Sequence, residues 1–317
     1  MGMQPQSRAG RAQVAAHSDD VVRTYGEMLS PFPGRHRRVR IRREQRAHVI
    51  EVGEGPPALF LHGDYTSSLS FLMLLEHLEG IRAIAVDRQG RGLSDPEPPV
   101  ARSRFRDATV EFVDDVVTAL GLDAVTLVGQ SGGGIAALWY AMARPERVRS
   151  LVLLGSIPLL PGTRSPALLR LMASPGLGTV LARLAKPTPK SLVRLLSSVG
   201  EGETIVRYPE FIDANVAGGN DPVAAAANLA ELRAVIHPFG FRRSMRFRPA
   251  ELRGLSMPTL VIWGDNDPIG SVDVARTATG LIPDARLEVL PGGHVPQFGH
   301  PERVAALVSD FVRSGPT

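Results

Sequence analysis

Residues 125–143 read VTLVGQSGGGIAALWYAMA, and this stretch decides the fold class. A strand-like run, Val125–Val128, leads into Gly129-Gln130-Ser131-Gly132-Gly133, and a helical run, Ile135–Ala143, follows. A serine between such a strand and helix lies on a sharp turn, with its hydroxyl oxygen beyond the end of the strand. Glycine is required on both sides because larger side chains would collide with the strand and the helix. The order of strand, turn and helix therefore predicts that Ser131 is a nucleophile.

The glycine-rich start of this helix has a second interpretation. Backbone N–H groups at a helix N-terminus also bind phosphate. Phosphate-binding loops carry a Gly-Lys-Ser/Thr or a G-x-G-x-x-G signature, and neither follows Ser131. The nucleophile is favoured, and the helix N-terminus would then place positive partial charge beside an anion formed at the serine.

Short apolar runs alternate with amphipathic helical patterns along most of the chain. The runs that predict buried parallel strands are residues 58–62, 81–87, 125–129, 151–155, 259–263 and 287–290, after an antiparallel pair at 39–43 and 48–52. Apolar residues at helical spacing recur at 113–120 and 304–311. This alternation predicts a mostly parallel sheet with helices on both faces, and a site where loops leave the carboxyl ends of the strands.

One segment, residues 157–253, interrupts this alternation. Its helical stretches are 167–173, 180–185 and 191–198. Several prolines separate them, no clear strand is present, and the segment is too long for a loop between two strands. We expect a helical cap at 157–253, inserted into an α/β core of residues 31–156 and 254–317, after a flexible N-terminal segment, residues 1–30.

A serine hydroxyl needs a base to take its proton, and the chain contains eight histidines. His294 follows the last predicted strand, in Leu290-Pro291-Gly292-Gly293-His294, where a loop can reach the carboxyl edge of the sheet. The other histidines lie in the N-terminal region, within a strand, in helical runs or in the cap: His17, His36, His48, His77, His237 and His300; His62 lies in the loop that leaves the strand at 58–61. His294 is therefore the predicted base.

The base needs a carboxylate that orients it and stabilises the imidazolium. No Asp or Glu occurs between Glu146 and Glu201, so the acid must come from a later loop. Asp267 follows the strand at 259–263, and Asp265, two residues earlier, is the alternative. We predict that Asp267 is the acid.

The tetrahedral intermediate of acyl transfer needs hydrogen-bond donors for its oxyanion. The loop His62-Gly63-Asp64-Tyr65 leaves the strand at 58–61, so its backbone can face Ser131. We predict the N–H groups of Asp64 and Gly132 as donors and His62 as a brace for the loop. Tyr65 and Gln130 are candidate substrate-contacting residues. For Tyr65 the alternative is that its loop is an ordinary solvent-exposed loop.

Together these motifs resemble the α/β-hydrolase superfamily, in its serine-hydrolase branch with a helical cap. A further match is Asp87-Arg88-Gln89-Gly90-Arg91-Gly92-Leu93-Ser94-Asp95, which looks like the D-x-x-G-x-G-x-S loop of that family. The resemblance covers residues 45–313 apart from the cap. It implies an eight-stranded, mostly parallel sheet and a nucleophile, acid and base in the order Ser131, Asp267, His294.

Departures from individual subfamilies narrow the expected chemistry. Haloalkane dehalogenases and epoxide hydrolases carry aspartate where this chain has Ser131. Enzymes that cleave ring-fission diketones usually carry a glycine-rich oxyanion loop, which Asp64-Tyr65-Thr66 replaces here. The H-G-G-G loop of another esterase group is also missing.

The resemblance and the motifs imply hydrolysis of a carboxylic ester, lactone or thioester through an acyl-Ser131 intermediate, without metal or cofactor. The alternatives are a C–C bond hydrolase or metabolite-tailoring enzyme that uses the same residues, and a non-catalytic small-molecule-binding protein. The cap is rich in Leu, Ala and Pro, which suits a small-molecule substrate with an apolar portion; the alternative is that this composition simply builds helices. Its terminal arginines, Arg242, Arg243, Arg246 and Arg248, indicate either a site for an acidic substrate group or a solvated basic face.

Composition sets the remaining limits. The chain has no cysteine, which excludes disulfides, thiolate metal sites and a cysteine nucleophile. Its first residues lack the apolar run of a secretory signal, and no stretch is long and apolar enough for a membrane span, so we expect a cytoplasmic protein without membrane association. The formal net charge is +4, and the basic run 35–46 alternates arginine with Val39 and Ile41. We interpret this run as the exposed face of an outer strand rather than a nucleic-acid surface. The sequence does not determine an oligomeric state.

Overall fold

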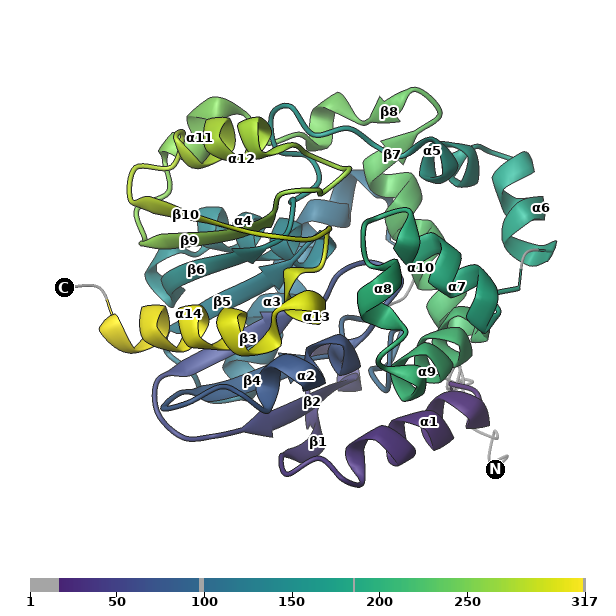
Figure 1. Cartoon of the computed structure of the whole chain (residues 1–317), viewed down its shortest axis with the longest axis horizontal. Coiled ribbons are helices and arrows are strands. Elements are labelled where there is room, and N and C mark those ends of the chain that lie inside the picture. Colours follow the sequence, from purple (N-terminus) through teal and green to yellow (C-terminus); the bar gives the residue numbers. More distant parts are fainter. Residues whose placement is uncertain (1–16, 97–99, 185, 316–317) are drawn as a thin grey trace, which may run out of the picture.

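The computed structural model describes residues 17–96, 100–184 and 186–315, and its larger sheet has eight strands with helices on both faces (Figure 1). The strand order is β1-β2-β4-β3-β5-β6-β9-β10, in which β2 pairs antiparallel with β1 and β4 and the other neighbours are parallel. The strands are β1 Arg35–Arg40, β2 Arg46–Val52, β3 Pro57–Leu61, β4 Arg82–Val86, β5 Val125–Gln130, β6 Val148–Leu154, β9 Thr259–Gly264 and β10 Ala285–Leu290. The predicted fold class is confirmed.

Two apolar cores lie on opposite faces of this sheet because successive side chains of a strand point to opposite sides. In β3, Leu59 and Leu61 belong to one core, and Ala58 and Phe60 belong to the other. The first core is covered by α3 (Phe105–Ala119), α4 (Gly132–Ala143) and α12 (Val272–Thr279); the second by α1 (Asp19–Leu29), α2 (Leu72–Leu75) and α14 (Pro301–Ser314).

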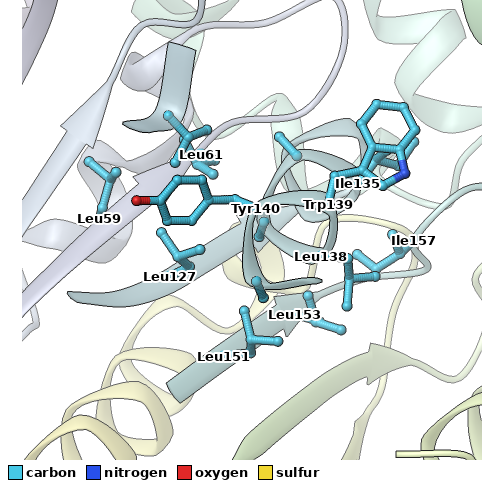
Figure 2. Packing of buried hydrophobic residues seen from close by; sticks show 14 of the residues in the cluster. Leu59, Leu61, Leu127, Ile135, Leu138, Trp139, Tyr140, Leu151, Leu153 and Ile157 are labelled. Atoms are coloured by element: carbon cyan, nitrogen blue, oxygen red, sulfur yellow. The ribbon is translucent and has the colours of Figure 1, made fainter. Parts of the chain in front are cut away.

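Helix α4 is buried along almost its whole length. Its side chains pack against leucines of β3, β5 and β6, as Figure 2 shows for Trp139, Tyr140 and their neighbours. A helix that is apolar all round belongs in the interior of a protein, which explains the continuous run of apolar residues after Ser131. The packing fixes the start of α4, and with it the position of the serine.

The predicted flexible N-terminal segment is wrong for residues 19–29, which form helix α1. Val21, Tyr25 and Leu29 are spaced four residues apart and are all buried, so one stripe of the helix packs against the second core. The Tyr25 hydroxyl also donates a 2.9 Å hydrogen bond to Asp87. Residues 1–16 of the predicted segment lie outside the described part of the chain.

Residues 157–253, here called the cap segment, connect β6 to β9. Its helices are α5 Ala167–Ala173, α6 Leu177–Leu184, α7 Pro189–Ser197, α8 Gly202–Ile205, α9 Pro209–Asn220, α10 Pro222–Val235 and α11 Pro249–Arg253. A two-stranded hairpin, β7 (Ile236–His237) and β8 (Gly240–Phe241), was not predicted because two residues are too few to show a strand pattern. In Figure 1 helices α7 to α10 lie together beside the sheet.

Short elements complete the chain. They are α13 Pro296–Gly299 and the 3₁₀ helices η1 Arg42–Glu44, η2 Ser68–Phe71, η3 Arg102–Arg104, η4 Pro145–Arg147 and η5 Arg243–Met245. Strand β1 is an edge strand of the sheet. Val39 of β1 and the adjacent Ile41 are buried, as predicted, while the arginines of β1 are exposed. Three of them, Arg37, Arg38 and Arg40, lie within ion-pair distance of carboxylates on the neighbouring segments.

Candidate active site

Ser131 lies on the turn between β5 and α4, with φ +50° and ψ −115°. A non-glycine residue with positive φ is strained and persists only where its surroundings hold it. The flanking glycines leave no space for a side chain: a Cβ at Gly129 would lie 2.6 Å from Gly134 Cα, and a Cβ at Gly133 would lie 1.9 Å from Leu61 O. The turn therefore needs both glycines.

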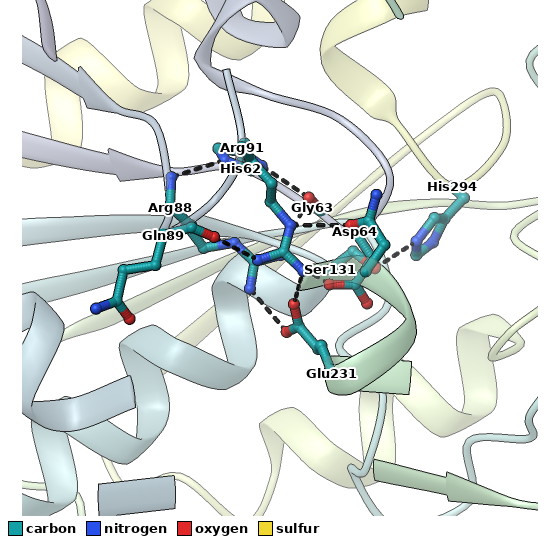
Figure 3. Close-up of polar contacts among 10 residues, drawn as sticks. His62, Gly63, Asp64, Arg88, Gln89, Arg91, Ser131, Glu231 and His294 are labelled. Atoms are coloured by element: carbon teal, nitrogen blue, oxygen red, sulfur yellow. Dashed lines mark hydrogen bonds and ion pairs between the residues drawn. The ribbon is translucent and has the colours of Figure 1, made fainter. Parts of the chain in front are cut away.

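Three loops bring the predicted nucleophile, base and acid together. His294 Nε2 lies 2.9 Å from Ser131 Oγ, and His294 Nδ1 lies 2.8 Å from Asp267 Oδ2. A neutral imidazole with its hydrogen on Nδ1 satisfies both contacts, since it donates to Asp267 and accepts from Ser131. All three residues are buried. Figure 3 shows the His294 ring directed at Ser131.

The alternative acid, Asp265, has a different place in the structure. It is exposed, and its Oδ1 accepts hydrogen bonds from the Gly292 N–H at 2.9 Å and from Asn266 Nδ2 at 2.7 Å. Asp265 therefore holds the turn that precedes His294, whereas Asp267 contacts the imidazole itself.

Ser156 was not predicted as part of the site. It is fully buried after β6, its N–H donates to Asp267 Oδ2 at 2.9 Å, and its Oγ lies 3.1 Å from His294 Nδ1. The Ile269 N–H donates to the other oxygen of Asp267, also at 2.9 Å. Two backbone donors thus fix the carboxylate. The signal available in the sequence was the position of Ser156 just past the carboxyl end of a predicted strand.

The electrostatics of the pair favour a charged imidazole. Burial alone would lower the pKa of His294, but the charge and hydrogen bond of Asp267 outweigh it, so the pKa is raised. Burial alone would raise the pKa of Asp267, but His294 and the N–H groups of Ser156 and Ile269 outweigh it, so that pKa is lowered. An imidazole in this place can take a proton from Ser131 and hold it.

Glu201, in the cap segment, was also missed. Its side chain is almost fully buried, and its Oε1 accepts a 2.8 Å hydrogen bond from the N–H of Val295, the residue after His294. The His294 N–H donates to the carbonyl of Val199 at 2.9 Å. The loop at 199–201 therefore holds the backbone of the histidine on both sides. The charge of Glu201 also contributes to the raised pKa of His294.

The predicted oxyanion donors lie on adjacent turns. Gly132 opens α4, so its N–H has no partner within the helix. A Cβ at Gly132 would lie 2.1 Å from Asp64 Oδ1, which means that the Asp64 carboxylate packs against this backbone. His62 is fully buried, and its Nε2 accepts a 3.0 Å hydrogen bond from the Arg88 N–H, so it braces the loop as predicted.

The two candidate substrate-contacting residues differ in their surroundings. Gln130 is buried, and its side-chain oxygen lies against Gly63, where a Cβ would approach it to 2.0 Å. Tyr65 is half-buried and lines a small cavity with Phe211 and Asn215 of α9. Its hydroxyl is buried and has no hydrogen-bond partner in the described part of the chain.

A buried ionic cluster joins the Asp64 loop to helix α10 of the cap segment (Figure 3). Arg88 donates to Asp64 Oδ1 at 2.7 Å and to Glu231 Oε1 at 2.8 Å. Arg91 pairs with the other oxygen of Glu231 and donates to Asn228 Oδ1 at 2.9 Å. We call these five residues, Asp64, Arg88, Arg91, Asn228 and Glu231, the ionic cluster.

The two carboxyl groups of the ionic cluster respond oppositely to it. Burial would raise the pKa of Glu231, but the two guanidinium groups outweigh it and lower the pKa to about 2. Burial and the charge of Glu231 raise the pKa of Asp64. Glu231 is therefore the firmly ionised member, and Asp64 is the one that protonates more readily.

Comparison with known proteins agrees with this architecture. Residues 56–301 match the family described as the alpha/beta hydrolase fold. The chain belongs to that family. It is 33% identical to a 2-hydroxymuconate semialdehyde hydrolase of Pseudomonas putida, over 84% of this chain and 90% of the relative. It is 29% identical to a 2-hydroxy-6-oxononadienedioate/2-hydroxy-6-oxononatrienedioate hydrolase of Burkholderia vietnamiensis, over 85% and 92%.

Solved structures of α/β hydrolases show the same fold. Carboxylesterase CesB of Bacillus subtilis superposes with a TM-score of 0.73 at 23% identity, covering 94% of this chain and 100% of the esterase. The meta-cleavage product hydrolase CumD of Pseudomonas fluorescens superposes with a TM-score of 0.68 at 23% identity, covering 88% and 97%.

In this α/β hydrolase the loop after β4, which carries the D-x-x-G-x-G-x-S pattern, has a structural centre, Asp87. Its Oδ1 accepts from Tyr25 and from the Ser68 N–H, and its Oδ2 accepts from the Leu93 N–H and contacts His48. Burial would raise the pKa of Asp87, but His48, His62 and the Leu93 N–H outweigh it and lower the pKa to about 2. The loop is thereby held so that Arg88 and Arg91 reach the ionic cluster.

Two further observations concern membrane-spanning helices and metal-binding groups. Within residues 17–96, 100–184 and 186–315, no helix is long and apolar enough to cross a membrane. The same residues contain no group of three His, Asp or Glu side chains placed to hold a metal ion.

Proposed function

We propose that this α/β hydrolase cleaves a carboxylic ester, lactone or thioester through an acyl-Ser131 intermediate. The observation that carries the proposal is the hydrogen-bonded chain from Ser131 through His294 to Asp267, which begins at a serine held on a strained turn. A nucleophile, a base within hydrogen-bond reach and a group that orients the base are the elements of covalent acyl transfer.

The proposed reaction has two halves. Ser131 Oγ attacks the carbonyl carbon while His294 Nε2 takes the hydroxyl proton. The oxyanion that forms accepts hydrogen bonds from the N–H groups of Asp64 and Gly132. The bond to the alcohol or thiol then breaks, and His294 returns the proton to that leaving group. In the second half His294 takes a proton from water, the hydroxide attacks the acyl carbon, and Ser131 recovers its proton as the acid departs.

The Asp64 carboxylate makes the oxyanion site unusual. A negative charge beside Gly132 would oppose a second negative charge on the intermediate, because like charges repel more strongly in a buried site. Arg88, which pairs with Asp64 at 2.7 Å, offsets this repulsion. We therefore propose that Arg88 is required for oxyanion stabilisation even though it lies behind the loop.

Cleavage of a carbon–carbon bond is the second candidate. It is supported by the relatives, which are named as hydrolases of 2-hydroxymuconate semialdehyde and of 2-hydroxy-6-oxononadienedioate. The same attack would occur at a ketone, but His294 would have to deliver the proton to a carbon leaving group. Asp64-Tyr65-Thr66 stands where such enzymes usually have a glycine-rich loop, so we place ester cleavage first.

We further propose that residues 157–253 act as a cap that shapes the substrate site. The support is that this segment contacts the core on both sides of Ser131, through Glu201 at the His294 loop and through Glu231 at Arg88, which pairs with Asp64. A small molecule with an apolar portion would bind between cap and core.

Covalent labelling with a fluorophosphonate tests the proposal. Wild-type protein is expected to react stoichiometrically and Ser131→Ala not at all, because only an activated serine attacks the probe. Turnover is then measured on p-nitrophenyl esters of increasing acyl length, on lactones, and on a 2-hydroxy-6-oxo-dienoate. Labelling with turnover only of the dienoate would select C–C cleavage. Protein inert to both the probe and the panel would eliminate catalysis and leave a binding protein.

A further inference from the structure

A pocket of about 760 Å³ lies between helix α10 of the cap segment and helices α3 and α4 of the core. Its size suits a small molecule. Ser131 and His294 are not among the residues that line it, whereas Arg88 and Glu231 of the ionic cluster are. The pocket therefore borders the ionic cluster, and no bond-making step of the proposed reaction takes place in it.

Two helices give the pocket apolar walls. On α10 the lining residues Val223, Ala227, Ala230 and Ala234 recur every three or four positions, so they form one face of the helix. Their small side chains leave the space open. From α3, the side chains of Phe105, Phe112 and Val113 contribute the opposite wall. These walls suit the hydrocarbon part of a ligand.

The charges of the pocket are one-sided. Five arginines line it, Arg88, Arg91, Arg102, Arg233 and Arg242, against one described carboxylate, Glu231. Glu231 is already paired with Arg88 and Arg91. Among the described residues no carboxylate lies within ion-pair distance of the other three arginines.

Within the described part of the chain, the side chains of these three arginines have neutral partners or none. Arg233 donates to the Thr179 hydroxyl at 2.6 Å, and Arg242 donates to the carbonyl of Arg233 at 3.0 Å. The Nε atoms of Arg88 and Arg233 are buried and have no hydrogen-bond partner in the described part of the chain. Burial and the nearby charge of Arg102 both lower the pKa of Arg242. A bound anion would relieve this arrangement.

We propose that this pocket binds an organic carboxylate with an apolar body. The carboxylate lies against Arg233 and Arg242, and the hydrocarbon lies between the alanines of α10 and the phenylalanines of α3. Of the four arginines at the end of the cap segment, Arg242 alone lines the pocket, because Arg246 lies over the Phe241 ring and Arg248 pairs with Glu251. The proposal does not depend on catalysis by Ser131.

The ligand has two possible sources with the same chemistry. It is a separate organic acid, or it is the distal carboxylate of a long substrate whose other end reaches Ser131. The second source is supported by Arg88, which lines this pocket and also contacts Asp64, the residue that packs against Gly132.

Isothermal titration of the full chain with octanoate tests the proposal, with octylammonium and 1-octanol as ligands of matched length. Wild-type protein is expected to bind octanoate and to bind the other two at least tenfold more weakly. The double variant Arg233→Gln/Arg242→Gln is expected to weaken octanoate binding at least tenfold, because it removes charge-assisted hydrogen bonds. Ala230→Phe, which fills the pocket from an exposed helix position, is expected to do the same.

Arg243→Gln is the matched control, since Arg243 is exposed, adjacent to Arg242 and outside the pocket. Its octanoate affinity is expected to stay within twofold of wild type, and circular dichroism establishes that every variant is folded. Absence of octanoate binding to wild type, or equal binding by all variants, would overturn the proposal.

Blocking Ser131 with the fluorophosphonate separates the two sources. Octanoate affinity that survives blocking identifies a separate acid, whereas affinity that is lost identifies a pocket continuous with the serine site. The binding experiment is also independent of the proposed function. If the protein fails to react with the fluorophosphonate but still binds octanoate through Arg233 and Arg242, the binding inference stands and only the catalytic proposal is refuted.

Discussion

The cap segment meets the core at two junctions, one on each side of Ser131, and they are built differently. At the first, the carboxylate of Glu201 accepts a single backbone N–H, from Val295, and the carbonyl of Val199 accepts another, from His294. At the second, Glu231 pairs with two buried arginines, one of which also pairs with Asp64.

This difference separates two ways of organising a site. At the first junction both donors are backbone N–H groups, which have fixed positions, so it defines one place for the His294 ring. The second uses charged side chains that can exchange partners, and a buried ion pair contributes little net stability while it is costly to break. We therefore expect the first junction to control the geometry of catalysis and the second to control the stability of the cap and access to the arginine-lined pocket.

The largest expected effect is on stability, from Arg88→Ala. It leaves the half-buried Asp64 and the buried Glu231 without a shared cation, and removal of one partner from a buried pair costs about 3–5 kcal/mol of unfolding free energy. Urea denaturation measures this value. The control is Arg276→Ala, whose exposed pair with Asp273 is expected to contribute less than about 1 kcal/mol. Equal costs for the two variants would show that the second junction is not an energetic unit.

The second prediction concerns the loss of stability at low pH. Glu231 has its pKa lowered to about 2 in the folded protein, so its contribution to stability is complete above the unfolded value near 4.5 and is lost as the pH falls toward 2. Glu201 has its pKa raised by burial, so acid does not weaken its junction in the same window. We expect Glu231→Gln to flatten the fall of unfolding free energy between pH 5 and 2.5.

Glu201→Gln is the matched variant for that measurement, because it removes a buried carboxylate at the other junction. The unfolding free energy of Glu201→Gln is expected to fall between pH 5 and 2.5 by as much as that of the wild type. A Glu231→Gln profile parallel to wild type would mean that Glu231 is not the source of acid sensitivity.

The third prediction is kinetic and applies if Ser131 is catalytic. Glu201→Ala removes the acceptor for the Val295 N–H and should lower kcat/KM about tenfold, as expected for a misplaced base. Glu201→Gln keeps an oxygen in that place and should lose less than about threefold. Both variants remove a negative charge that raises the pKa of His294, so the acid limb of the pH profile of kcat/KM should move to lower pH in both.

Rescue of kcat/KM by glutamine is also expected if Glu201 only supports the backbone. The shift of the acid limb is expected only if the charge of Glu201 acts on His294. A profile that keeps its wild-type acid limb in both variants would contradict an electrostatic effect of Glu201 on His294.

The smallest expected effect belongs to Ser156→Ala. The substitution removes the Oγ near His294 Nδ1 but leaves the Ser156 N–H that donates to Asp267. One neutral hydrogen bond contributes about 0.5–1.5 kcal/mol, so kcat/KM should fall about twofold to tenfold. Steady-state kinetics on the best ester of the panel measure it. A loss beyond a hundredfold would assign Ser156 a larger part than support of the imidazole.

The residues that could be predicted from the sequence are those with a local signal. Ser131, His294 and Asp267 each follow a strand pattern, and the parallel sheet brings those strand ends to one edge. Glu201 and Glu231 carry no such signal, since they lie in the cap segment, 94 and 143 residues from the groups they bind. Their partners depend on how the cap packs, which no short motif encodes.

Helix α1 shows a different limit. Its stripe of Val21, Tyr25 and Leu29 is visible at helical spacing, but a helix of 11 residues is marginal without tertiary contacts. Whether it forms depends on the surface it covers, here the second core and Asp87.

The backbone of Ser131 has a consequence for how such a site persists through evolution. At φ +50° a glycine would sit without strain, so replacement of the serine by glycine is expected to make the fold more stable. Selection for thermal stability alone would therefore favour replacement of Ser131 by glycine. A lineage that keeps serine there does so against that pressure, through the benefit of the hydroxyl group.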